Sequence, residues 1–143
     1  MKFITSTHLK RWADTRESQS LLPELVRRLI CASVKQLDRL SFPCGDAVHM
    51  HGWDGIVSCP EPIDLVPEGD SLWECGVNKE IQAKANDDII KRAADPLGHI
   101  KSNSTFVFVT PREWAGADAW VIANQSGWKK LVVYTAIELE AWI

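Results

Sequence analysis

Apolar residues recur every three to four positions along much of this chain, which is the spacing that buries one side of an α-helix. The strongest pattern begins at Leu21 and continues through Leu22, Leu25, Val26, Leu29, Ile30, Ser33, Val34 and Leu37. Pro23 fits this helix only in its first turn, where no helical hydrogen bond needs the N–H that proline lacks. The same periodicity predicts further helices over residues 5–17, 81–94, 117–124 and 137–143.

Shorter apolar runs predict the strands of a β-sheet. Residues 105–109 form a continuous apolar run, which is typical of a strand buried on both faces. Two strands, at 47–51 and 55–58, would flank Trp53-Asp54-Gly55 as a tight turn. Further strands are predicted at 71–77 and 129–134. The order of these elements predicts an α/β (α+β) fold, with helices flanking a mixed central sheet.

The helix over residues 81–94 combines an apolar stripe with a row of charges. Its predicted buried positions are Ile81, Ala85, Ile89 and Ala93. Lys84, Asp88 and Lys91 follow one flank, where we expect them to pair with one another and to face solvent. Asn78 is the expected N-cap of this helix.

Composition excludes several classes of protein. The chain has 143 residues, 45% hydrophobic and 24% charged, which matches one ordinary globular domain over residues 1–143. Its formal net charge of -3 argues against coating of nucleic acid by bulk electrostatics, so a nucleic-acid partner would need a local basic patch. The cysteines stand singly, which excludes a Cys-x-x-Cys zinc knuckle. No apolar run approaches the roughly 20 residues of a membrane span, so we expect a cytoplasmic protein with no membrane partner.

Two isolated acids with apolar neighbours are the candidate functional residues. Asp54 precedes one predicted strand, and Glu74 lies inside the next. Neighbouring strands would bring both carboxylates together, as a metal-dependent hydrolytic site requires. Asp54 has an alternative interpretation as a turn residue before Gly55. Glu74 has an alternative interpretation as a buried acid paired with Lys79 or Arg92.

A pair of histidines offers a weaker candidate. His49 and His51 alternate with Val48 and Met50, so both imidazoles would point to one face of the predicted strand. Metal binding there is one interpretation. A polar strand face is the simpler one, because no third ligand stands nearby in the sequence.

Four segments carry a resemblance to a known family. They are Gly52-Trp53-Asp54-Gly55, Trp73-Glu74-Cys75-Gly76 with Lys79, Lys91-Arg92-Ala93-Ala94-Asp95-Pro96-Leu97-Gly98, and Phe106-Val107-Phe108-Val109-Thr110-Pro111-Arg112. Over nearly the whole chain, this arrangement resembles the PD-(D/E)XK nuclease superfamily, which has the restriction-endonuclease-like fold. More narrowly, it looks like the N-terminal effector domain of bacterial anti-phage defence proteins similar to antiviral STAND ATPases.

The resemblance implies a metal-dependent nuclease, with double-stranded DNA as the expected substrate. It implies that Asp54 and Glu74 bind Mg²⁺ or Mn²⁺ and that the backbone carbonyl of Cys75 adds a ligand. The ion would polarise the scissile phosphate and activate water.

The catalytic lysine is where this chain departs from the superfamily pattern. The lysine normally stands two residues after the strand acid, a position that Gly76 occupies here. Gly76 leaves room beside the acid for a long side chain from elsewhere. Lys79 is the expected catalytic lysine, with Lys84 as the second choice. Glu24 is predicted to lie opposite the apolar stripe of its helix, so the extra glutamate of the superfamily is not assigned to it.

The resemblance also implies partners. We expect this chain to be the N-terminal part of a larger protein that forms a homo-oligomer, and assembly would place two basic edges on one DNA duplex. The alternative is a catalytically silent nuclease-like domain that serves oligomerisation or partner recruitment. The missing lysine two residues after Glu74 favours this alternative.

Overall fold

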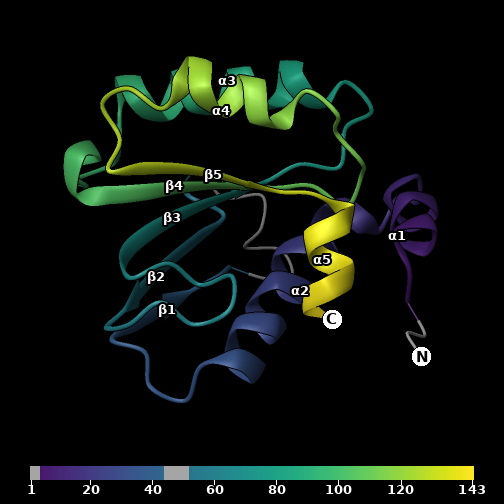
Figure 1. The fold of residues 1–143 in the computed structure, drawn as a ribbon, viewed down its shortest axis with the longest axis horizontal. Helices are drawn as coiled ribbons and strands as arrows, with labels where there is room; N and C mark the ends of the chain where they lie inside the picture. Colours follow the sequence, from purple (N-terminus) through teal and green to yellow (C-terminus); the bar gives the residue numbers. More distant parts are fainter. Residues whose placement is uncertain (1–3, 44–51) are drawn as a thin grey trace.

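The computed structural model describes residues 4–43 and 52–143. At its centre is a five-stranded sheet whose strands follow chain order (Figure 1). The strands are β1 (Arg39–Ser41), β2 (Gly55–Cys59), β3 (Gly69–Cys75), β4 (Ser104–Val109) and β5 (Lys130–Tyr134). β2 is antiparallel to β1 and β3, whereas β4 is parallel to β3 and β5. The mixed sheet predicted from the sequence is confirmed.

Helices cover both faces of this sheet (Figure 1). α3 (Ile81–Ala94) and α4 (Ala117–Asn124) lie on one face, and α2 (Ser18–Ser33) and α5 (Ala136–Trp142) lie on the other. α1 (Ser6–Ala13) packs against α5. None of the helices in the described part of the chain is both long enough and apolar enough to cross a lipid bilayer.

Alternating side chains of β3 and β4 build a separate core on each face of the sheet. Trp73 and Val107 are fully buried towards α2 and α5, and Leu72 and Phe106 are fully buried towards α3 and α4. Every residue of β4 is buried. The prediction that this strand is buried on both faces is therefore confirmed. A short 3₁₀ helix, η2 (Lys101–Asn103), leads into it.

The beginning of the sheet differs most from the prediction. β1 was not predicted, and it pairs along its whole length with β2. The predicted strand at 47–51, together with His49 and His51, lies outside the described residues. Gly55 begins β2, where an added Cβ would come within 2.2 Å of the Phe42 ring. Glycine at this position is therefore required for the ring to pack over the strand.

α2 begins earlier than the sequence pattern predicts. Because it starts at Ser18, Pro23 lies in the second turn, and its predicted place in the first turn is wrong. Proline cannot donate the usual hydrogen bond to the carbonyl of Gln19, four residues back. Pro23 is buried, so packing against the neighbouring elements offsets part of that loss.

α3 has the predicted bounds but a different orientation. Its N-cap residue is Glu80, so the predicted cap at Asn78 is wrong. Ala85 is buried as predicted. Asp88 and Arg92 are buried as well, so part of the charged flank faces the sheet, whereas Lys91 is exposed to solvent as predicted.

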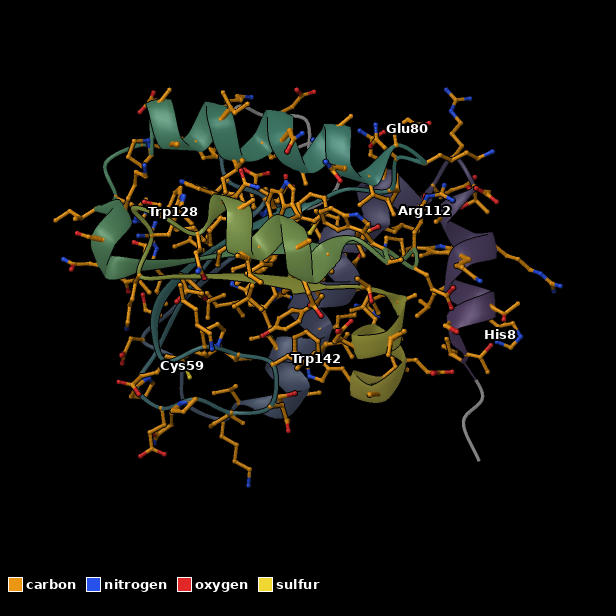
Figure 2. The ribbon with its side chains drawn as sticks, turned by 45° about the horizontal axis from the view of Figure 1, so that its top comes forward. His8, Cys59, Glu80, Arg112, Trp128 and Trp142 are labelled. Atoms are coloured by element: carbon orange, nitrogen blue, oxygen red, sulfur yellow. The ribbon has the colours of Figure 1, made fainter. Side chains whose placement is uncertain are left out.

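Arg112 ties α1 to the turn that follows β3 (Figure 2). Its Nε donates to the carbonyl of Val77 at 2.7 Å. The same guanidinium donates to the carbonyl of Ala13 at 3.2 Å and forms an ion pair with Asp14 at 2.9 Å. The turn between β3 and α3 is thus braced by α1, which is far from it in the sequence but adjacent in the fold.

Candidate active site

The start of β2 and the end of β3 bring the two predicted acids together. The strand register pairs Gly55 with Trp73, so Asp54 and Glu74 occupy the next opposed positions. Asp54 Oδ2 accepts a 2.7 Å hydrogen bond from the backbone N–H of Cys75. This bond holds the Asp54 carboxylate against β3, a contact that a residue serving only a turn would not need.

Arg92 holds Glu74 from the helix side. Its Nε donates to Glu74 Oε1 at 2.6 Å, and each side chain is only 5% exposed. The guanidinium also donates to the carbonyl of Gly52 and lies over the Trp53 ring, 5.1 Å from the ring centroid. The predicted alternative that Glu74 pairs with Lys79 or Arg92 is confirmed for Arg92.

The structure places Lys84, and not Lys79, beside the two acids. The side chain of Lys84 enters the pocket, where Nζ donates to Asp88 Oδ1 at 2.9 Å. An added Cβ on Gly76 would come within 2.9 Å of Lys84 Cγ, so Gly76 does make room for a lysine from elsewhere. Lys79 is exposed and lies outside the pocket lining. The expectation that Lys84 leans to solvent is wrong, because α3 turns this flank towards β3.

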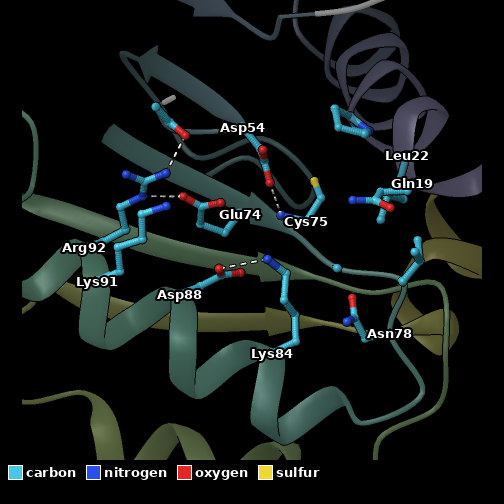
Figure 3. Close-up of a pocket in the computed structure, with 14 residues that line it drawn as sticks. Gln19, Leu22, Asp54, Glu74, Cys75, Asn78, Lys84, Asp88, Lys91 and Arg92 are labelled. Carbon is cyan, nitrogen blue, oxygen red and sulfur yellow. Dashed lines mark hydrogen bonds and ion pairs between the residues drawn. The ribbon is translucent and has the colours of Figure 1, made fainter. Parts of the chain in front are cut away.

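These side chains line one pocket of about 440 Å³ (Figure 3). Asp54, Glu74 and Cys75 form the wall contributed by the strands, and Lys84 and Asp88 project from α3 opposite them. The start of α2 closes a third side. The pocket is therefore lined by four segments: the start of α2, the residues just before β2, the end of β3 with the turn after it, and one flank of α3.

Burial alters the pKa values of Glu74, Asp88 and Lys84. Burial raises the pKa of Glu74 to about 9, and the charges of Asp54 and Asp88 add to this effect. The hydrogen bond from Arg92 opposes it. Burial likewise raises the pKa of Asp88, against the opposing contact with Lys84. Burial acts to lower the pKa of Lys84, but its hydrogen bond to Asp88 and the nearby acids outweigh burial and raise it.

Asp88 is the site residue that sequence analysis missed. Among the described residues, its Oδ2 is a buried oxygen without a hydrogen-bond partner. Lys84, Asp88 and Arg92 are spaced four residues apart, so they share one face of α3. That spacing was visible in the sequence, but it is equally typical of ion pairs on a solvated helix surface.

The oxygen atoms of the pocket suit a hard divalent cation. Mg²⁺ is commonly held by one or two carboxylates together with substrate phosphates and water, and Asp54 and Glu74 supply two carboxylates. The unpartnered oxygen of Asp88 adds buried negative character that a cation would offset. The residues present therefore fit Mg²⁺ or Mn²⁺. Within residues 4–43 and 52–143, no group of three or more His, Cys, Asp or Glu side chains is arranged to hold a metal ion.

Comparison with protein-family models, with curated proteins and with solved structures found no match. The chemistry of the pocket therefore follows from its own side chains. These are two acids on adjoining strands, a lysine and an acid on α3, and an arginine that neutralises one of the strand acids.

Proposed function

We propose that this domain is a divalent-metal-dependent nuclease that hydrolyses phosphodiester bonds, with double-stranded DNA as its expected substrate. The observation that carries the proposal is the meeting of Asp54, Glu74 and Lys84 in one pocket. Two carboxylates and a fixed cation are what metal-assisted hydrolysis of a phosphodiester requires. A role in anti-phage defence, within a larger chain, is the setting that the sequence resemblance suggests.

Each residue has a distinct role in this proposal. Asp54 and Glu74 hold Mg²⁺ or Mn²⁺, and the carbonyl of Cys75 is the further ligand that the resemblance implies. The bound cation supplies Lewis-acid activation of the phosphate and of water. Lys84 keeps its proton because its pKa is raised, so its ammonium stabilises the negative charge that develops on the phosphate. Asp88 fixes that ammonium through the 2.9 Å contact.

Basic side chains at the pocket support a polyanionic substrate. Lys84 and Lys91 line the pocket, and Lys91 is exposed to solvent. Phosphate binding depends on the local density of Lys and Arg rather than on the net charge of the chain, which is -3.

The direct test is incubation of supercoiled plasmid with the purified chain and Mg²⁺ or Mn²⁺. Nicking or linearisation is expected, with loss of both in EDTA and in the Glu74→Gln variant. Glutamine keeps the size of the side chain and can still accept a hydrogen bond from Arg92, so the fold should be retained. Cleavage by the variant at the wild-type rate, with unchanged melting, would overturn the proposal. Parallel incubations with single- and double-stranded RNA show which nucleic acid the chain cleaves.

One observation favours the second candidate, a catalytically silent domain that recruits partners. Glu74 is already paired with Arg92, and Asp54 already accepts a backbone hydrogen bond. Acids satisfied in this way can be retained for structure alone. Calorimetric titration with Mn²⁺ separates the candidates: binding that is lost in Asp54→Asn supports the nuclease, and no binding to the wild-type chain supports the silent domain.

A further inference from the structure

A groove of about 530 Å³ runs along β5, which forms one edge of the sheet. Within the described residues, the outer side of β5 has no strand partner. One wall of the groove is the loop at residues 62–67, which is anchored by a 2.7 Å hydrogen bond from Tyr134 Oη to the carbonyl of Leu65. The other wall is α4, through Val121 and Ile122. The floor is the strand itself.

The two edges of the sheet differ in what they offer to another chain. β1 is three residues long, with Arg39 and Ser41 exposed. β5 is five residues long and is uncharged after Lys130. Ile122 is 72% exposed beside it. An apolar edge strand of this kind presents unpaired backbone groups that an added strand can satisfy. The groove therefore fits an extended strand with apolar side chains.

We propose that the strand that fills this groove is β5 of a second copy of the chain, paired antiparallel about a two-fold axis at Val132. This register places Leu131 opposite Val133 of the second copy and Lys130 opposite its Tyr134. Residues directly opposed in an antiparallel pair share one face of the sheet, so Val132 meets Val132 on one face and Leu131 meets Val133 on the other. A two-fold contact of this type is closed, which gives a dimer rather than a filament.

The charges of the groove select both the partner and its direction. Lys130 stands at the beginning of β5, whereas the Leu65 contact places Asp64 near Tyr134 at its end. α4 connects two parallel strands and so runs antiparallel to them, which places Asp118 at that same end. An antiparallel second copy brings its Lys130, which lies on the same face as Tyr134, to Asp64, and symmetry repeats the contact, whereas Asp118 lies on the opposite face of the sheet. Parallel pairing would instead set lysine beside lysine.

Site-specific cross-linking tests the register. Val132→Cys would place two thiols opposite each other at the axis, about 5 Å apart at Cβ. A short thiol-specific cross-linker should then give a covalent dimer in high yield. Leu40→Cys, at the middle of β1, is the matched control, and the wild-type chain reports on its own cysteines. Cross-linking of Val132→Cys no greater than that of these controls would overturn the pairing.

Sedimentation of the 143-residue chain over a range of concentrations tests whether the β5 surface forms a dimer. We expect a monomer–dimer equilibrium whose dissociation constant rises on the order of tenfold or more in Ile122→Glu and in Lys130→Glu. Both side chains are exposed, so melting should not change when it is measured at concentrations where the wild type is monomeric. Asp64→Lys added to Lys130→Glu should recover part of the affinity, because the charges are exchanged. A chain that remains monomeric would overturn the proposal, and so would a dimer whose dissociation constant is unchanged by both substitutions.

Discussion

The strand wall and the helix wall of the pocket are built in different ways. On the strand wall, Asp54 and Glu74 are placed by the backbone register of β2 and β3. On the helix wall, Lys84 and Asp88 are placed by the rotation of α3 against the sheet, which Gly76 permits. The sequence shows the first kind of placement directly, because an isolated acid in an apolar strand is conspicuous. It conceals the second kind, because the same charges would suit a solvated helix.

The largest expected effect comes from the strand wall. Asp54→Asn and Glu74→Gln should each lower cleavage by about 1000-fold or more, since each removes a proposed metal ligand, which would contribute several kcal/mol. Mn²⁺ affinity, measured by calorimetry, should fall in both variants. Full metal affinity in both would show that the strand wall does not hold the ion.

A substitution in the helix wall should lower the cleavage rate less than one in the strand wall, and it should leave metal affinity unchanged. Lys84→Ala should cleave on the order of 100-fold more slowly, which is the scale for removal of one electrostatic stabiliser. Mn²⁺ affinity should persist, because an ammonium is not a ligand. Lys79→Ala is the matched control and should change little, as Lys79 is exposed outside the pocket. If Lys79→Ala is the inactive variant, the lysine of the turn is catalytic and the helix wall is not.

Arg92 links the two walls, so its removal should affect stability. Arg92→Met should lower the free energy of unfolding by about 2 kcal/mol, measured by urea denaturation. Breaking a fully ionised buried pair costs roughly 3 kcal/mol or more, but here Glu74 can take up a proton in compensation. Adding Glu74→Gln should recover part of the loss. A variant as stable as the wild type would show that the pair does not hold the walls together.

The pH dependence of stability tests the buried acid itself. The pKa of Glu74 is raised from 4.5 to about 9, so the folded protein keeps a proton that the unfolded chain releases. The metal-free protein should therefore lose stability as pH rises from about 4.5 towards 9. Thermal melting across this range should show the decline, and Glu74→Gln should flatten it. A wild-type melting temperature that increases over the same range would contradict the assignment.

Long, regular elements could be predicted from the sequence, and short or context-dependent ones could not. The bounds of α3 and the burial of β4 follow from periodicity over many residues. β1 is too short to show a period. The N-terminal end of α2 was misplaced because proline was given its usual first-turn position, whereas Pro23 lies in the second turn, where its burial offsets part of the cost of the missing N–H.

The same distinction applies to the site. Asp54 and Glu74 were identifiable because strand order alone brings them together. The choice of Lys84 over Lys79 depends on the direction in which α3 presents its flank, and this direction is set by packing of Ala85 and Ile89 against β3 and β4 rather than by local sequence. Asp88 was missed for the same reason.

Gly76 and Lys84 also constrain how this domain can evolve. A side chain at position 76 would meet Lys84 Cγ and Phe108 Cζ, at 2.9 and 3.0 Å from its Cβ. A lysine at position 76 and Lys84 on α3 would therefore compete for one space. Gly76→Lys alone would crowd two lysines together. Replacement of Lys84 alone would leave no lysine at this place. The two positions should therefore be epistatic, and the two arrangements of the lysine should be separated by an intermediate of low fitness.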